Sequence, residues 1–360
     1  GFFDNTTHPS HKERSARSPF FLFFSTPIRL FPPASDVVVN LPEACGCRGP
    51  QGAHMRLSMR QCLKPFLNPL LILIAATTCN ALTALISRII SDKGVPVGFL
   101  LTLVGAGYMT ITSCLLYTSD IPRTSSRKLL MARGFTAAVT QSLYVLSVNL
   151  SPMGPATTLG NTTPMFTAII SRFALAERTG VRGAISIVLS GIGVYLVATT
   201  RAYPSIDEPS SREHTLVVVG YCCALLSACT WAACLIMLRL SRNVFHPIEG
   251  AHWQAIFLVP VGLVVWAVDN DGSFKLPSEV DIGEFIPMVL AMMFTYVAPN
   301  LIVSFVAPNI PSNVSSTVTT TEIAWGYMWG VTLLGEPMHW RAGIGSALVF
   351  AAVIVTTAGG

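Results

Sequence analysis

Long apolar segments separated by short polar ones fill the chain from residue 66 onward. We predict ten such segments, each close to the roughly 20 residues that an α-helix needs to cross a bilayer. They are Phe66–Ser87, Pro96–Tyr117, Leu129–Val148, Pro155–Leu175, Val181–Thr200, Leu216–Leu238, Ala251–Val268, Phe285–Val306, Val314–Leu334 and Ala342–Ala358. Charged residues make up only 11% of the chain, whereas soluble domains carry about 25%. The sequence therefore predicts an all-α membrane protein in contact with the lipid bilayer.

The first 54 residues do not share this pattern. Their apolar stretch, FFLFFSTPIRLF, is too short to span a bilayer and is interrupted by Pro27 and Arg29. We expect residues 1–54 to be a disordered tail or a gene-model extension, with Met55 as the natural start.

Two parts of the sequence resemble each other at a nearly constant spacing. Glu177 and Arg182 correspond to Glu336 and Arg341, which lie 159 residues later in both cases. A period this long is typical of the paired halves of membrane transporters, since solenoid repeats are only about 20–50 residues long. We expect each of these glutamates to pair with the arginine of its own repeat at the membrane surface.

Ten segments divide into two units of five, and the odd number makes the second unit enter the membrane from the opposite side. We therefore predict two inverted repeats, at residues 55–200 and 216–360, joined by a linker at residues 201–215. With the N-terminus inside, twelve Lys and Arg residues fall on the inner side of the membrane and six on the outer side. Because cytoplasmic loops are enriched in positive charge, we expect both termini in the cytoplasm. The sequence is compatible with either the plasma membrane or an endomembrane.

Several function classes lack support in the sequence. It contains no nucleotide-binding loop, no supported catalytic arrangement and no metal-ligand spacing among its nine cysteines. No basic face with interleaved aromatic residues points to nucleic acid. We therefore expect neither an enzyme nor a cofactor nor a nucleic-acid partner, and any transport would run on a solute or ion gradient.

The segment from residue 144 to residue 197 resembles the EamA repeat of the drug/metabolite transporter superfamily. The shared features are a tyrosine before the fourth segment, a proline within it, an acidic residue followed by Arg or Pro at its end, and glycines in the fifth segment. Here these are Tyr144, Pro164, Glu177-Arg178, Gly191 and Gly193, with Glu336-Pro337 ending the ninth segment. The resemblance covers residues 66–358, and the TTTE sequence ending at Glu322 resembles the solute-carrier 35G-like branch, which is related to nucleotide-sugar transporters.

This resemblance implies a secondary transporter that moves a small polar or anionic organic solute by alternating access around a mid-membrane site. A non-transporting membrane regulator or scaffold with the same fold is the alternative. A homodimer is left open as an assembly. The second half departs from the family pattern, because Glu322 lies near the position that corresponds to Pro164.

Glu322 is the most informative polar residue, since it lies near the middle of the ninth predicted segment. A carboxylate at the bilayer centre costs about 2.5–3.5 kcal/mol on insertion scales, so it must face protein or water. Glu322, Gly326 and Gly330 recur at the spacing of one helical face, and the glycines let a neighbouring helix approach closely. We predict that Glu322 points into the bundle, where it binds substrate, couples protons, or serves only as a hydrogen-bonding contact to another helix.

Further polar residues within the predicted segments are candidates to bind substrate in the same cavity. They are Asn80, Gln141, Tyr144, Asn161, Thr162 and Asn300. Asn161 and Thr162 precede Pro164, which we expect to kink the fourth segment and free a backbone carbonyl for a ligand. Small residues of that segment, including Ala156 and Gly160, predict close packing against the ninth segment. Each polar residue could instead serve only to join helices.

Overall fold

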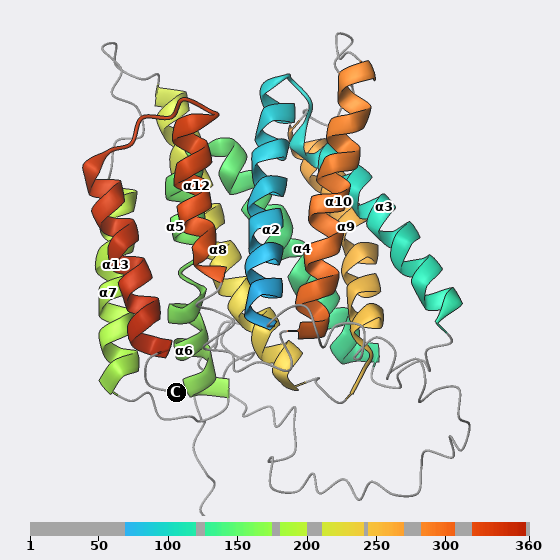
Figure 1. Cartoon of the computed structure of the whole chain (residues 1–360), viewed down its shortest axis with the longest axis horizontal. Helices are drawn as coiled ribbons and strands as arrows, with labels where there is room; N and C mark the ends of the chain where they lie inside the picture. The colour runs from blue at the N-terminus through green and yellow to red at the C-terminus, as the bar shows by residue number, and fades with distance from the viewer. Residues whose placement is uncertain are drawn as a thin grey trace, which may run out of the picture. The chain divides into compact units, whose positions relative to one another are not determined.

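The computed structural model describes residues 69–119, 127–174, 181–199, 211–240, 244–269, 282–306 and 319–357. The regular structure of these residues is helical (Figure 1). In chain order the helices are α2 (Pro69–Asp92), α3 (Val97–Thr118), α4 (Arg127–Leu150), α5 (Met153–Gly160), α6 (Thr163–Ala174), α7 (Val181–Ala198), α8 (Ser211–Leu240), α9 (Pro247–Asp269), α10 (Ile282–Val306), α12 (Thr321–Thr332) and α13 (Trp340–Thr357). The predicted tail at residues 1–54 and Glu177 lie outside the described residues.

Six helices in the described part of the chain are long and apolar enough to cross a membrane. They are α2, α3, α4, α8, α9 and α10. Each of them overlaps one of the predicted segments, and α7 contains a shorter apolar stretch, Ala184–Ala198. The chain is therefore a multi-pass integral membrane protein.

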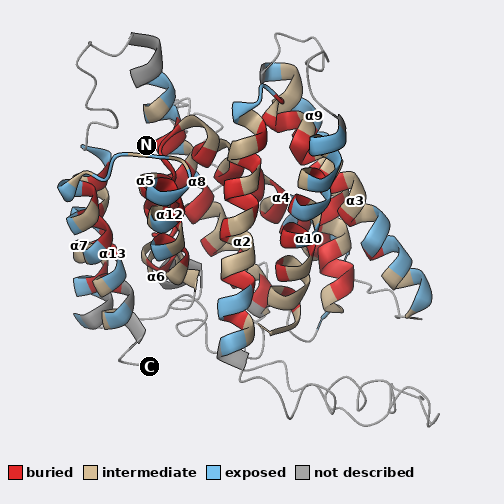
Figure 2. Cartoon of the chain, turned by 45° about the horizontal axis from the view of Figure 1, so that its top comes forward, coloured by how far each residue is buried: buried red, intermediate tan, exposed pale blue. Residues whose placement is uncertain are grey.

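Large apolar side chains on α7 point away from its helical neighbours. Ile185, Val188, Ile192 and Tyr195 are all exposed, and they recur at the spacing of one helical face. Buried residues concentrate where helices meet, and exposed ones lie along the outer faces (Figure 2). An apolar face of this kind is stable against lipid tails but would favour association in water.

Helices from the two halves of the sequence pack against each other. α3 lies against α9, and α4 lies against both α8 and α9. α2 packs against α10, α5 against α12, and α7 lies beside α13 (Figure 1). The largest apolar core lies among α3, α9 and α10 and includes Leu100, Leu258 and Tyr296. The two halves therefore share one core.

Helices approach each other closely at several glycines. A Cβ atom at Gly193 of α7 would lie 2.6 Å from the Gly345 carbonyl oxygen of α13, and one at Gly345 would lie 2.7 Å from the Gly193 carbonyl oxygen. A Cβ at Gly326 of α12 would overlap the Thr157 hydroxyl of α5. The predicted packing of the fourth segment against the ninth is confirmed. Gly160, however, faces the Tyr144 ring of α4.

The fourth predicted segment is two helices with a break between them. α5 ends at Gly160 and α6 begins at Thr163, so Asn161 and Thr162 lie between the two. Pro164 is the second residue of α6, where its missing N–H interrupts no helical hydrogen bond. The prediction of a proline inside a helix was wrong, because in a continuous helix its ring would clash with the Gly160 carbonyl.

α8 begins at Ser211, inside the segment predicted to be a linker at residues 201–215. The polar sequence SREHT contains Arg and Glu, which both favour helix. Because a helix can continue into the polar region beyond the hydrocarbon core, the apolar boundary at Leu216 did not mark its start.

Replacing Gly193 by Val is expected to destabilise the protein. The new side chain would meet the Gly345 carbonyl and the Val349 side chain, so α7 and α13 would have to separate, at a cost of about 1–3 kcal/mol. Gly191→Val is the matched control, since a Cβ at Gly191 has no neighbouring heavy atom within 4 Å. Thermal unfolding in detergent should show a lower midpoint for Gly193→Val alone, and equal midpoints would contradict the contact.

Candidate functional site

Glu322 lies in the first turn of α12 and is buried, with only 6% of its surface exposed. Tyr144 of α4 donates a hydrogen bond to the Glu322 Oε1 at 2.6 Å, and Asn80 of α2 donates another at 3.1 Å. Asn161, directly after α5, is a further side-chain partner of the carboxyl group. We call these four residues the Glu322 cluster. Glu322 thus points into the bundle, as its spacing from the glycines predicted.

The surroundings of Glu322 supply hydrogen-bond donors to its buried carboxyl group. A buried carboxylate is tolerated only when hydrogen-bond donors or opposite charges surround it. The cluster supplies a phenol and carboxamide groups as donors, and the first turn of α12 places the carboxyl group at the positive end of the helix dipole. One helix of the C-terminal half is thereby joined to α2, α4 and the end of α5.

The break between α5 and α6 positions the Asn161 side chain. The backbone carbonyls at the break, however, already accept hydrogen bonds within the protein. The Thr162 hydroxyl donates to the Leu159 carbonyl at 2.6 Å, and the Thr163 hydroxyl donates to the Gly160 carbonyl at 3.2 Å. Hydroxyl groups therefore donate to carbonyls at the break, and the Leu159 carbonyl also accepts the Thr162 N–H at 3.2 Å. The carbonyl expected to be free for a ligand already has a partner, and the Thr162 hydroxyl proton is used within its own turn.

Gln141 lies one helical turn before Tyr144 on α4, so the two side chains share a face. Its side chain is buried, and its Nε2 atom has no hydrogen-bond partner among the described residues. A buried amide without a partner is costly and rare. Gln141 therefore offers an unused donor next to the Glu322 cluster.

Asn300 belongs to a second polar group, which we call the Gln254 cluster. Gln254 of α9 donates from Nε2 to the Tyr296 hydroxyl at 3.1 Å and to the Asn300 Oδ1 at 3.2 Å. Asn300 also donates to the Tyr296 carbonyl within α10 at 2.8 Å. None of these Asn300 contacts involves Glu322, so the predicted polar residues within the described part of the chain divide between two clusters.

Arg133 is a buried charged residue that the sequence analysis did not single out. It lies in the second turn of α4 with 4% of its surface exposed, and its Nη2 donates to the Ser304 hydroxyl of α10 at 3.2 Å. Arg133 was expected to be one of the positive charges that flank the membrane. The sequence signal for its burial was its position, four residues inside the predicted segment Leu129–Val148.

Glu336 holds the start of α5. Gly335 adopts a left-handed conformation (φ 65°) after α12, and the Glu336 N–H bonds the Gly330 carbonyl at 2.8 Å, which turns the chain back. The Glu336 carboxylate then accepts the Met153 N–H at 2.8 Å. Burial raises the pKa of Glu336, and this backbone donor and the charge of Arg88 act against that rise.

The expected pairing of Glu336 with Arg341 is wrong. The Arg341 side chain is exposed and stands over the Trp340 ring, 5.4 Å from its centroid. The free N–H groups at the start of α5 hold Glu336 instead, because a helix N-terminus attracts a carboxylate. Glu177 was predicted to pair with Arg182, and the side chains of both residues lie outside the described part of the structure.

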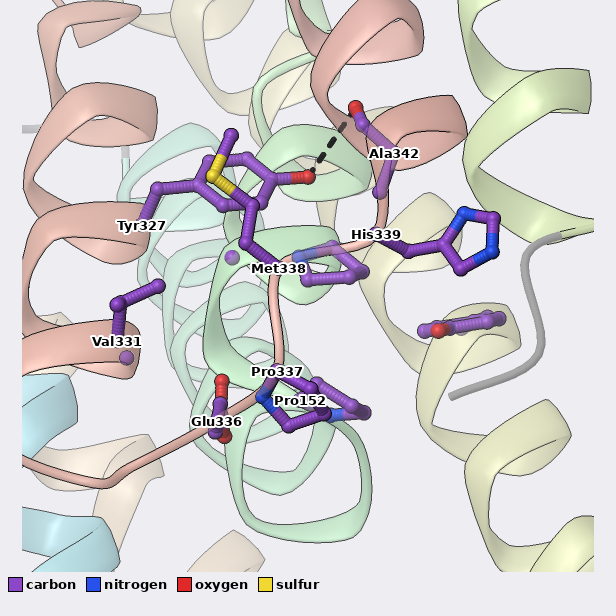
Figure 3. Close-up of a pocket in the computed structure, with 12 residues that line it drawn as sticks. Pro152, Tyr327, Val331, Glu336, Pro337, Met338, His339 and Ala342 are labelled. Carbon is purple, nitrogen blue, oxygen red and sulfur yellow. Dashed lines mark hydrogen bonds between the residues drawn. The ribbon is translucent and has the colours of Figure 1, made fainter. Parts of the chain in front are cut away.

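A pocket opens at this end of α5 and α12, bounded also by α8 and α13 (Figure 3). Its lining residues are Pro152, Gly154, Pro155, Tyr221, Tyr327, Gly330, Val331, Glu336, Pro337, Met338, His339 and Ala342. Glu322 is not among them. The contact of Gly326 with Thr157 lies between Gly330 and Glu322 along α12, so the pocket does not reach the Glu322 cluster.

Replacing Tyr144 by Phe is expected to destabilise the protein by about 1–3 kcal/mol, because the buried Glu322 carboxyl group loses one of its hydrogen-bond donors. Tyr195→Phe is the control, since the Tyr195 ring is exposed on α7. Unfolding midpoints of the two purified variants test this directly. Equal stability of both variants would show that Tyr144 contributes nothing to holding the carboxyl group.

Comparison with known proteins identifies the family of this chain. No curated protein matches the chain in sequence. A solved structure described as "Crystal structure of protein" matches with a TM-score of 0.54 and 14% identity, over 79% of this chain and 96% of the other. That likeness concerns the fold alone. The EamA-like transporter family model matches twice, at residues 67–199 and 218–358, and the chain therefore belongs to the EamA-like transporter family.

Proposed function

We propose that this protein is a secondary transporter that moves a small polar or anionic organic solute by alternating access. The buried Glu322 carboxyl group carries the proposal, because it lies inside a bundle to which both halves of the chain contribute. Ionisable residues within membrane segments are costly and commonly mark solute or ion pathways. Family membership over both halves supports transport as the general class.

The Glu322 cluster is the proposed centre of the solute site. Its carboxyl, phenol and carboxamide groups can accept and donate hydrogen bonds to the hydroxyl or amine groups of a solute. Gln141 adds an unused amide donor one turn away. Glu322 is also the proposed coupling group, since a carboxyl group can exchange a proton or pair with a cation during the cycle. Thr162 and Asn300 are weaker candidates, because the Thr162 hydroxyl donates within its own turn and Asn300 belongs to the Gln254 cluster.

Ten helices in two inverted units of five are the proposed architecture, with a first repeat at residues 55–200, a linker up to α8 and a second repeat to residue 360. The helix contacts support it. If α2, α3, α4 and α7 correspond to α8, α9, α10 and α13, exchanging the halves turns the α4–α8 contact into the α10–α2 contact. The same exchange turns α4–α9 into α10–α3 and leaves α3–α9 and α7–α13 unchanged.

Individual contacts between α7 and α13 support the same repeat. Gly193 touches Gly345, and Ser186 donates a hydrogen bond to the Ala352 carbonyl at 2.8 Å. Ala352 lies 159 residues after Gly193, and Gly345 lies 159 residues after Ser186. This is also the spacing between Glu177 and Glu336, so one contact is the counterpart of the other under exchange of the repeats.

The contact between α5 and α12 fits a conformation closed at the Glu336 end. Gly326 lies against Thr157 and Gly154 against Tyr327, so the contact between these helices separates the pocket of Figure 3 from the Glu322 cluster. In alternating access, a site closed at one end is reached from the other. The described conformation is therefore proposed to receive solute from the end where α4 begins.

Cysteine labelling should establish the topology. With both termini in the cytoplasm, a cysteine replacing Lys93 between α2 and α3 should react with an impermeant maleimide from outside. One replacing Val244 between α8 and α9 should react from outside only after the membrane is permeabilised. The native cysteines should first be changed to serine or alanine. Labelling of both positions from the same side would contradict the inverted arrangement.

Replacing Glu322 by Gln tests the proposed function. The protein, reconstituted in proteoliposomes, should first be screened for uptake of sugars, nucleotide sugars and organic acids. If Glu322 couples protons, Gln keeps the hydrogen-bonding shape but cannot lose a proton, so gradient-driven uptake should be lost while counterflow exchange persists. If the carboxylate binds a cationic part of the solute, both activities should fall.

Glu284→Gln, a carboxyl-to-amide change at an exposed position in the first turn of α10, is the matched control for the chemistry of the substitution. Wild-type uptake and exchange by Glu322→Gln would remove this residue from the mechanism. A complete absence of uptake across the solutes, with the protein folded, would favour a membrane regulator or scaffold instead.

A further inference from the structure

Arg133 is held inside the bundle with part of its guanidinium group unused. The Nη2 atom donates to Ser304, whereas Nε and Nη1 have no hydrogen-bond partner among the described residues. The group stands over the Phe245 ring, 5.9 Å from its centroid, and packs against Gly250 at the start of α9. The fold therefore positions the guanidinium group but does not saturate it.

Arg133 takes part in no ion pair within the described part of the chain. A guanidinium group stays charged at every physiological pH. Ion pairs are found at Arg88 with Asp92 and at Lys93 with Glu284, but none includes Arg133. Arginine within a membrane segment is expected to face a counter-charge or a water-filled cavity. A bound anion would supply the direct ionic partner that Arg133 lacks among these ion pairs.

A second unused donor lies in the same region. Tyr108 of α3 is fully buried, and its hydroxyl has no hydrogen-bond partner among the described residues. It is close enough to Arg133 for the two to interact electrostatically, and its ring packs edge-on against Tyr296. Unused N–H and O–H donors from two different helices form the donor set that a carboxylate or phosphate requires.

The face of α4 links Arg133 to the Glu322 cluster. Arg133, Gln141 and Tyr144 stand at positions i, i+8 and i+11, which fall within about 80° of one another around a helix. Tyr144 contacts Glu322, and Gln141 has an unused donor. At 1.5 Å per residue, Arg133 lies about 16 Å along α4 from Tyr144, towards the end of the bundle opposite Glu336.

We propose that Arg133, with the Tyr108 hydroxyl, binds the carboxylate or phosphate group of an anionic solute on its way to the Glu322 cluster. The proposal rests on the proposed function and narrows its substrate class from polar or anionic solutes to anionic ones. A lipid headgroup is a poor fit, because α3, α4, α9 and α10 enclose these side chains and leave only 4% of Arg133 exposed.

Anion binding to the full-length protein tests the proposal. The protein is placed in nanodiscs of phosphatidylcholine, which has no net negative headgroup, and its thermal midpoint is measured against inorganic phosphate or acetate at constant ionic strength set with chloride. Phosphate or acetate should raise the midpoint of the wild type with a saturable dependence. Arg133→Gln should weaken this apparent affinity about tenfold or more, since a charge-assisted hydrogen bond is lost.

Arg341→Gln is the matched control, because it removes the same charge from an exposed position and should leave the affinity unchanged. Tyr108→Phe separates binding from folding. It removes a hydroxyl that the fold does not use, so stability without anion should be retained while the affinity for the anion falls. This variant also decides the question if Arg133→Gln does not fold.

Three results would overturn the proposal. They are no response of the wild type to either anion, an unchanged affinity in Arg133→Gln, or an unfolded Arg133→Gln together with an unchanged affinity in Tyr108→Phe. Uptake measurements distinguish failure of the anion-site proposal from failure of the proposed transport function. Glu322-dependent uptake of a neutral solute such as glucose, without anion binding, would leave the transporter intact and remove only the anion site.

Discussion

The absence of water from the hydrocarbon core is the constraint on which this structure depends. Every polar group inside the bundle must find a partner on another helix or within its own turn. Glu322 meets this requirement with donors from α2 and α4, and Gln254 meets it with Tyr296 and Asn300. The positions of the helices are therefore tied to a small number of polar side chains, and groups such as Arg133 that stay partly unpaired become informative.

The same constraint explains why the structure tolerates a broken helix where a soluble protein would use a loop. At the break, the Leu159 and Gly160 carbonyls accept hydrogen bonds from the Thr162 and Thr163 hydroxyls, and the Leu159 carbonyl also accepts the Thr162 N–H. Contacts at glycines act in the opposite way, since they let main chains approach without any side chain. The glycine contacts and the hydrogen-bonded break between α5 and α6 together place the Glu322 carboxyl group between the two halves of the protein.

Much of the fold could be predicted from the sequence, because apolar length and small-residue spacing directly reflect the lipid and the helix packing. The inward orientation of Glu322 followed from its spacing to Gly326, and Gly326 does contact α5. The partners of Glu322 could not be predicted, because they depend on which helices become neighbours. Asn80 lies 242 residues from Glu322, and no sequence pattern joins them. The role of Glu336 was missed for a similar reason, since its partner is a main-chain N–H that every residue except proline carries.

That contact between Glu336 and the Met153 N–H has a consequence for how the protein can change over time. The donor belongs to the main chain, so substitutions at position 153 other than proline keep it, and nothing at that position needs to change in step with Glu336. Covariation between the two positions would therefore be absent although the groups touch. An interaction that joins the two halves of the molecule would be visible in sequences only as a single acidic position, and its partner would leave no trace there.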